Sequence, residues 1–298
     1  MINEISSEDR KCLQELCLTN PKDDMTRIEE TKGGLLADSY LWILKHQNFI
    51  DWRDGENTGL LWIKGDPGKG KTMLLIGIVR EFEKTKSTRD SGLLSYFFCQ
   101  ATEPSLNKAT AVLRGLIYQL LVQQQSLISH LRERYDRENK LFESFNAFYA
   151  LSEILTKMLY DPCLTRVYLV VDALDECEDG LSQLLKFIIH TTLTSFPQVK
   201  WLVSSRNRPD IEAGMKINDS MVELRPLSLE LNAESVSRAV NTYIDHKVSE
   251  LAQMKGYDSY DNKLCVHPMN LKNDTFDQFQ KRSSSHFTSR VYRLLRPI

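Results

Sequence analysis

The sequence has little of several features that would mark a special class of protein. It contains only 13 glycines and 9 prolines among 298 residues, and 42% of its residues are hydrophobic, which excludes a collagen-like or a disordered chain. No segment approaches the ~20 consecutive apolar residues that a membrane helix needs. The first residues also lack the basic and then apolar order of a secretory signal. We therefore expect a soluble, cytoplasmic protein with no membrane span.

The sequence has no large excess of positive or negative charge, and its cysteines do not form a metal-binding or disulfide pattern. The 38 Lys and Arg residues are balanced by 40 Asp and Glu residues, which leaves a net charge of −2. A protein that holds nucleic acid by neutralising phosphates needs a clear positive excess, so we expect no nucleic-acid partner. The six cysteines are scattered, without a CxxC pair or a histidine at metal-ligand spacing, and reduced thiols are expected.

The distribution of polar and apolar residues predicts four parts of the chain. The first is a helical lead-in, with helices at 8–18 and 35–49, and the second is a compact α/β domain. The third is the start of a helical domain, which contains a helix at 232–253. The fourth is a divergent, loosely structured tail. Their predicted bounds are 1–58, 59–226, 227–255 and 256–298.

The second part alternates short apolar runs with longer helical patterns, which is typical of parallel βαβ units buried on both faces. We predict strands at 60–64, 92–99, 167–172, 200–205 and 221–224. Helices are predicted between them at 72–84, 106–125, 145–159 and 181–192. This order favours a three-layer α/β domain with a five-stranded, mainly parallel sheet.

A phosphate-binding loop follows the first of these strands. The eight residues that match the pattern G-x-x-x-x-G-K-[ST] are Gly65, Asp66, Pro67, Gly68, Lys69, Gly70, Lys71 and Thr72. The glycines allow backbone N–H groups to turn inward around an anion, and the following helix adds positive charge at its N-terminus. Lys71 is then expected to reach the β- and γ-phosphates, and the Thr72 hydroxyl to hold Mg²⁺. A glycine-rich turn that only links a strand to a helix is the alternative, and the strand and helix on either side argue against it.

Acidic residues end the strand at 167–172. Asp172 follows five apolar residues and so lies at the edge of the sheet where ligands of parallel sheets bind. We expect it to complete the Mg²⁺ site with Thr72. Either Asp175 or Glu176 is a candidate to orient or deprotonate an attacking water, and the sequence does not decide between them. An acidic, solvated loop is the alternative reading of this segment.

The next strand ends in Arg206, at the same edge of the sheet. A guanidinium there could sense the γ-phosphate or stabilise charge during its transfer. The alternative is an ordinary surface arginine. Arg208 precedes a proline and is expected in the turn that follows.

Several segments together resemble a known family, the NACHT-type signal-transducing NTPases of the STAND class. The resemblance is to fungal NLR-like proteins with a nephrocystin-3-like N-terminal domain, of the heterokaryon-incompatibility type. It spans about residues 12–255 and is carried by the phosphate loop and by segments 31–36, 38–44, 61–64, 95–98, 111–117, 172–177 and 226–230.

The resemblance implies a sheet in which the strand at 200–205 lies between the phosphate-loop strand and the Asp172 strand, with Arg206 beside the γ-phosphate. It also implies a switch controlled by bound ATP or ADP with Mg²⁺, with GTP as the alternative nucleotide. ATP hydrolysis would be slow, and the module would act in fungal non-self recognition or programmed cell death. Self-association, or assembly with related NLR-like proteins, is the implied partnership. Ala173 fits the small residue that this family places after the metal-binding aspartate.

Departures from the family leave two other functions open. Such proteins continue into further helical, winged-helix and repeat domains. Residues 256–298 match the family pattern only in a short segment at 273–276. We therefore expect a C-terminally truncated copy. A truncated copy could be an adaptor that no longer binds nucleotide. A small-molecule kinase would use the same loop, but no arginine-rich lid for an acceptor is evident.

Overall fold

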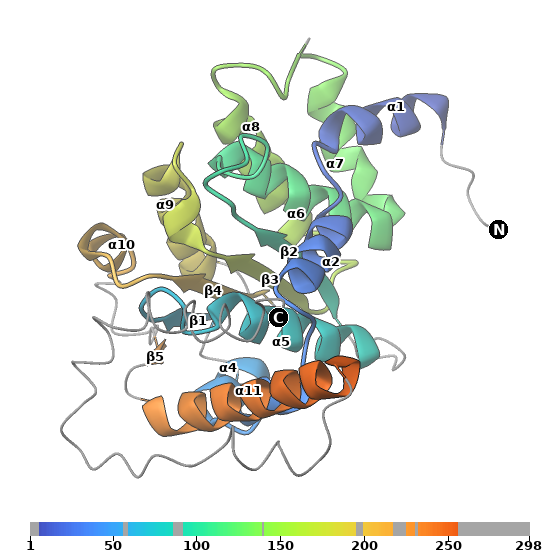
Figure 1. The fold of residues 1–298 in the computed structure, drawn as a ribbon. Coiled ribbons are helices and arrows are strands. Elements are labelled where there is room, and N and C mark those ends of the chain that lie inside the picture. Colours follow the sequence, from blue (N-terminus) through green and yellow to red (C-terminus); the bar gives the residue numbers. More distant parts are fainter. Residues whose placement is uncertain are drawn as a thin grey trace. The chain divides into compact units, whose positions relative to one another are not determined.

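The fold is described by a computed structural model, drawn in Figure 1, which describes residues 6–55, 59–85, 92–138, 140–194, 199–216, 225–229 and 232–255. The chain divides into two units, residues 1–244 and 245–298. The described part of the second unit is the end of one helix, residues 245–255. The architecture that follows is therefore that of the first unit.

Five parallel strands form a single sheet in the order β2-β3-β4-β1-β5. Their bounds are Leu60–Lys64 for β1, Leu93–Phe98 for β2, Val167–Asp172 for β3, Val199–Ser205 for β4 and Arg225–Ser228 for β5. β4 pairs with both β1 and β3. β4, which is followed by Arg206, therefore lies between β1, which leads into the phosphate loop, and β3, which ends in Asp172. This arrangement confirms the strand order implied by the resemblance.

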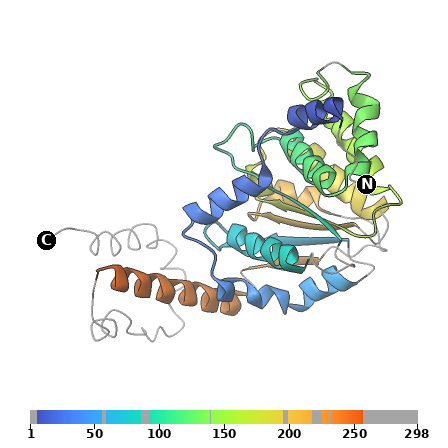
Figure 2. The ribbon, with the colours of Figure 1, turned by 90° about the vertical axis from the view of Figure 1, so that its right-hand side faces the viewer.

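Helices cover both faces of the sheet, as Figure 2 shows. One face packs against α2 (Pro21–Thr31), α3 (Leu41–Leu44), α4 (Gln47–Asp54) and α5 (Lys71–Thr85), and the short 3₁₀ helix η1 (Ala37–Ser39) precedes α3. The other packs against α1 (Ser7–Leu16), α6 (Ala109–Gln123), α7 (Ile128–Tyr135), α8 (Ala147–Leu159), α9 (Leu181–Thr194) and α10 (Pro209–Gly214). Successive strand residues point to opposite faces, so Leu61 joins the first core and Trp62 the second. The predicted three-layer α/β fold is confirmed.

One predicted lead-in helix is wrong. The stretch 35–49 is broken into η1, α3 and the start of α4. The break between α3 and α4 has a local cause, because the Nδ1 atom of His46 accepts a hydrogen bond from the backbone N–H of Asn48 and caps α4. Helices α2, α7 and α10 were not predicted. The helix predicted at 232–253 is present as α11, Ala233–Lys255.

The edge strand β5 differs in place from the predicted fifth strand. Residues 221–224 lie outside the described residues, and the strand that pairs with β1 is Arg225–Ser228. This strand contains Pro226, which has no N–H to donate and is therefore tolerated at the edge of a sheet. The tail at 256–298 also lies outside the described residues. The division of the chain into four domains stays a prediction.

The lead-in packs closely on the helix that begins at the phosphate loop. A Cβ atom on Gly77 of α5 would stand 2.2 Å from Cγ of Tyr40, a ring that is 3% exposed and whose hydroxyl donates to Glu81 on α5 at 2.6 Å. The two segments can approach this closely only because residue 77 is glycine. The lead-in and α5 are therefore parts of one packed layer.

We expect Gly77→Ala to destabilise the protein. Overpacking costs ~1–3 kcal/mol, and the better helix propensity of alanine returns at most ~1 kcal/mol, so the net loss in free energy of unfolding should reach up to about 2 kcal/mol. Denaturant unfolding measures it. In a Tyr40→Gly background, which also removes the Cβ atom that would lie 2.7 Å away, the same change should become neutral or stabilising. An equal loss in both backgrounds would show that the contact with Tyr40 is not the cause.

No helix within the described residues combines the length and the apolar character that crossing a bilayer requires.

Candidate nucleotide-binding site

The loop between β1 and α5 depends on glycine at two positions. Gly68 and Gly70 have φ angles of +78° and +79°, in the left-handed region that glycine enters without strain. A Cβ atom at either position would meet no atom within 4 Å, so the conformation and not the available space is what requires glycine. The predicted phosphate loop therefore has glycine at two positions that need it, and it opens directly into α5.

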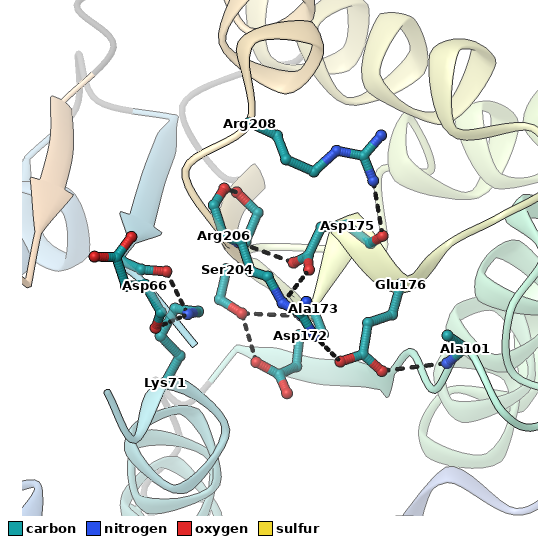
Figure 3. Close-up of polar contacts among 12 residues, drawn as sticks. Asp66, Lys71, Ala101, Asp172, Ala173, Asp175, Glu176, Ser204, Arg206 and Arg208 are labelled. Carbon is teal, nitrogen blue, oxygen red and sulfur yellow. Dashed lines mark hydrogen bonds and ion pairs between the residues drawn. The ribbon is translucent and has the colours of Figure 1, made fainter. Parts of the chain in front are cut away.

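The ammonium of Lys71 lies over the start of this loop. Its Nζ donates to the backbone carbonyls of Gly65 at 2.5 Å and Asp66 at 2.9 Å, as Figure 3 shows. The Asp66 carboxylate in turn accepts a hydrogen bond of 3.1 Å from the side-chain amide of Asn207. The loop that follows β4 thus holds the phosphate loop through Asn207, a residue that sequence reasoning missed.

The register of the sheet brings Asp172 and Ser204 side by side. Val171 of β3 pairs with Val203 of β4, so the next residue of each strand points to the opposite face, toward the layer that contains α5. Asp172 is 2% exposed and Ser204 is fully buried. The Ser204 hydroxyl donates to Oδ1 of Asp172 at 2.5 Å.

The environment of Asp172 is suited to a hard cation. Burial raises the pKa of its carboxyl, and hydrogen bonds from the Ser204 and Thr72 hydroxyls and the charge of Lys32 offset part of that rise. Within the described ranges, no ion pair of 4.0 Å or less joins Asp172 to a Lys or Arg residue, so its charge has no close counter-ion there. The structure brings Thr72 and Asp172 together as predicted, and a carboxylate with a hydroxyl is a donor set that Mg²⁺ accepts when phosphates complete its shell. The described residues hold no cluster of three or more His, Cys, Asp or Glu side chains fit for a metal ion.

Ala173 makes the turn that follows Asp172. Its φ of +53° lies in the left-handed region, which is uncommon for a residue with a Cβ. Its backbone N–H donates to the Ser204 hydroxyl at 2.9 Å. The turn leads into the 3₁₀ helix η3 (Leu174–Glu176), which directs the next two acidic side chains toward neighbouring strand ends.

Asp175 and Glu176 are both engaged, but to different degrees. The Asp175 side chain is 4% exposed and accepts from the backbone N–H of Arg206 at 2.9 Å. Glu176 is 31% exposed and accepts from the backbone N–H of Ala101, after β2, at 3.2 Å. The two carboxylates that the sequence could not rank therefore link the acidic turn to two different loops. Their proposed work on water stays a prediction.

Arg206 lies against these two carboxylates. Its Nε is 3.0 Å from Asp175 Oδ2 and its Nη2 is 3.5 Å from Glu176 Oε1, while its side chain is 50% exposed. Arg208 donates to the backbone carbonyl of Asp175 at 3.0 Å and precedes α10, in the turn where it was expected. Arg206 thus reaches the edge of the site from β4, and its role beside a γ-phosphate stays a prediction.

Three partners in this network were not found from the sequence, namely Ala101, Ser204 and Asn207. The available signal was positional, because each of them lies at or just after the carboxyl end of a predicted strand. Ligands of open parallel sheets bind at that edge. The hydrogen bonds themselves depend on the register between strands, which a single sequence does not provide.

A parallel sheet, a phosphate loop that opens a helix and a buried aspartate two strands away define a P-loop NTPase fold. The chain belongs to the nephrocystin 3 N-terminal family, whose model matches residues 38–206. This span includes the phosphate loop and Asp172, and it ends at Arg206. The family that the sequence resembled is thereby confirmed.

A curated relative extends the match beyond this domain. The chain is 51% identical over 259 residues to the vegetative incompatibility protein HET-E-1 of Podospora anserina. The alignment covers 87% of this chain and 19% of that protein. The chain therefore spans about a fifth of the length of this relative.

Solved structures give only distant similarity. The ORC1 protein of Aeropyrum pernix, solved in complex with DNA, has a TM-score of 0.38 at 16% identity, over 72% of this chain and 48% of that one. The Drosophila ORC, solved bound to DNA, has a TM-score of 0.36 at 16% identity, over 80% and 52%. DNA is a ligand of those two assemblies.

Proposed function

We propose that this chain binds a Mg²⁺-bound nucleoside triphosphate and works as a nucleotide-controlled signalling module. The observation that carries the proposal is the phosphate loop, in which two left-handed glycines precede Lys71 and Thr72, with Thr72 close to the buried Asp172. Backbone N–H groups and the N-terminus of α5 would bind the phosphates. Mg²⁺ held by Thr72 and Asp172 would neutralise charge on the β- and γ-phosphate oxygens.

The nucleotide in this proposal is ATP or ADP, with GTP as the alternative. The preference for adenine rests on the resemblance to NACHT-type proteins and on no contact in the structure. Lys71 would exchange its bonds to the carbonyls of Gly65 and Asp66 for bonds to phosphate oxygens. Its ammonium is already directed into the loop, so little reorganisation is needed.

Slow hydrolysis is the form of catalysis that the contacts favour. A water-activating carboxylate must keep an oxygen lone pair for the water, and backbone hydrogen bonds and the Arg206 guanidinium already take up part of the acceptor capacity of Asp175 and Glu176. Glu176 is the more exposed of the two and is the better candidate for that role. We propose a module that holds its nucleotide for long periods, with hydrolysis as a timer.

The biological setting is proposed from similarity. Identity of 51% to a vegetative incompatibility protein supports a role in fungal non-self recognition or programmed cell death. Self-association, or assembly with related NLR-like proteins, belongs to the same proposal. Light scattering with and without each nucleotide would measure the assembly directly.

The proposal is tested by calorimetric titration of the purified chain with ATP, ADP and GTP. Each titration is run with Mg²⁺ and again with EDTA. We expect saturable binding at one site for ATP and ADP, with a lower affinity for ATP in EDTA. A chain that unfolds cooperatively but binds none of the three nucleotides, and whose melting temperature none of them raises, would overturn the proposal in favour of an adaptor.

A further inference from the structure

Ser204 makes two hydrogen bonds with a single hydroxyl group. It donates to Oδ1 of Asp172 at 2.5 Å and accepts from the backbone N–H of Ala173 at 2.9 Å. A serine hydroxyl has one proton and two acceptor lone pairs. Since an N–H group can only donate, the proton of Ser204 is directed to the carboxylate, and the direction of both bonds is fixed.

This arrangement holds both the carboxylate and the chain that carries it. The bond to Oδ1 restricts rotation of the Asp172 side chain, and the bond from Ala173 supports the left-handed residue that turns the chain away from β3. Figure 3 shows both hydrogen bonds of the Ser204 side chain, one with Asp172 and one with Ala173. The bond takes one lone pair of Oδ1, and the carboxylate keeps further acceptor sites for a cation.

The neighbouring serine provides a contrast within the same strand. Ser205 is also fully buried, but it points to the opposite face of β4, where its hydroxyl accepts from the indole N–H of Trp62 at 2.9 Å and donates to the backbone carbonyl of Arg206 at 2.9 Å. Both serines occupy buried positions of one strand and both are fully hydrogen-bonded. Only Ser204 touches the aspartate.

We propose that Ser204 is a positioning residue for the metal-binding aspartate of this site. It fixes the orientation of the Asp172 carboxylate, so that the carboxylate is presented to Mg²⁺ near Thr72. The inference rests on the proposed Mg²⁺-dependent nucleotide binding and adds a residue from β4, the strand that separates β3 from β1. Mutation of a residue that hydrogen-bonds to a metal ligand typically lowers metal affinity by 10–100-fold.

The experiment compares Ser204→Ala with Ser205→Ala in the full chain. The Mg²⁺ concentration at which ATP binding is half-enhanced is measured by titration, and ATP affinity is measured separately in EDTA. We expect Ser204→Ala to raise the Mg²⁺ requirement by about tenfold or more and to leave the affinity in EDTA unchanged. Ser205→Ala should change neither quantity. Asp172→Asn sets the scale for complete loss of the metal effect.

A second variant protects the test against loss of folding. Ser204→Cys keeps nearly the same shape but has only a weak donor, so it should fold and move the Mg²⁺ requirement in the direction of the alanine variant. A wild-type Mg²⁺ requirement in Ser204→Ala, or an equal loss of ATP affinity with Mg²⁺ and with EDTA, would overturn the positioning role. Absence of ATP binding by the wild-type chain is a different result, and it would overturn the proposed function.

Discussion

Replacement of Lys71 by alanine should remove most of the affinity for a nucleoside triphosphate. The ammonium is held within the phosphate loop by two backbone carbonyls and is the side-chain cation that the loop pattern assigns to the phosphates. Loss of a charge-assisted contact of this kind costs ~2–4 kcal/mol, or roughly 30- to 1,000-fold in affinity. Calorimetric titration with Mg²⁺ and ATP measures the change.

The control for this variant is Lys69→Ala, two residues earlier in the same loop. It removes the same charge from the same segment, so a general electrostatic effect would appear in both variants. We expect Lys69→Ala to bind ATP almost as the wild type does, because the contacts of residue 69 with a phosphate would be made by its backbone. Wild-type affinity in Lys71→Ala, or equal losses in the two variants, would contradict the assignment of the loop.

Local sequence was sufficient for the parts of the site that are contiguous in the chain. The phosphate loop could be predicted because eight adjacent residues determine its backbone, from Gly65 to Thr72. Four strands were placed within a residue or two of their observed ends, since buried parallel strands appear as continuous apolar runs. The order of the strands came from the resemblance, because no periodicity reveals which strand lies beside which.

Contacts between separate segments could not be predicted. The bond between Ser204 and Asp172 depends on the register of β3 against β4. The break between α3 and α4 in the lead-in depends on the ring of His46, which accepts the backbone N–H of Asn48 and caps α4. In both cases a single polar side chain determines the local structure, and its sequence signal is much weaker than that of a glycine-rich loop.

The same limitation applies to the acidic turn, where the sequence left Asp175 and Glu176 as equal candidates for work on water. In the structure Asp175 is 4% exposed and contacts both the backbone N–H and the Nε of Arg206. A carboxylate fixed in this way is better suited to holding the end of β4 in place than to exchanging protons with a mobile water. Glu176 has fewer and longer contacts.

Asp175→Ala should therefore destabilise the fold, whereas Glu176→Ala should not. Loss of a hydrogen bond to a charged group costs ~1.5–3 kcal/mol, and the ion pair with Arg206 adds less than ~1 kcal/mol because the arginine is half exposed. We expect a fall of about 2–3 kcal/mol in the free energy of unfolding for Asp175→Ala, measured by denaturant titration without nucleotide. For the more exposed Glu176 we expect less than about 1 kcal/mol.

Single-turnover ATP hydrolysis then separates the two roles. Asp175→Asn keeps the shape of the side chain and one acceptor oxygen for the N–H of Arg206, so it should recover much of the stability that alanine loses. Glu176→Gln should slow hydrolysis more than Asp175→Asn does, with little effect on stability. The opposite pattern, with Asp175→Ala as stable as the wild type and Asp175→Asn unable to hydrolyse ATP, would assign the water-activating role to Asp175 and show that its contacts with Arg206 contribute little to the fold.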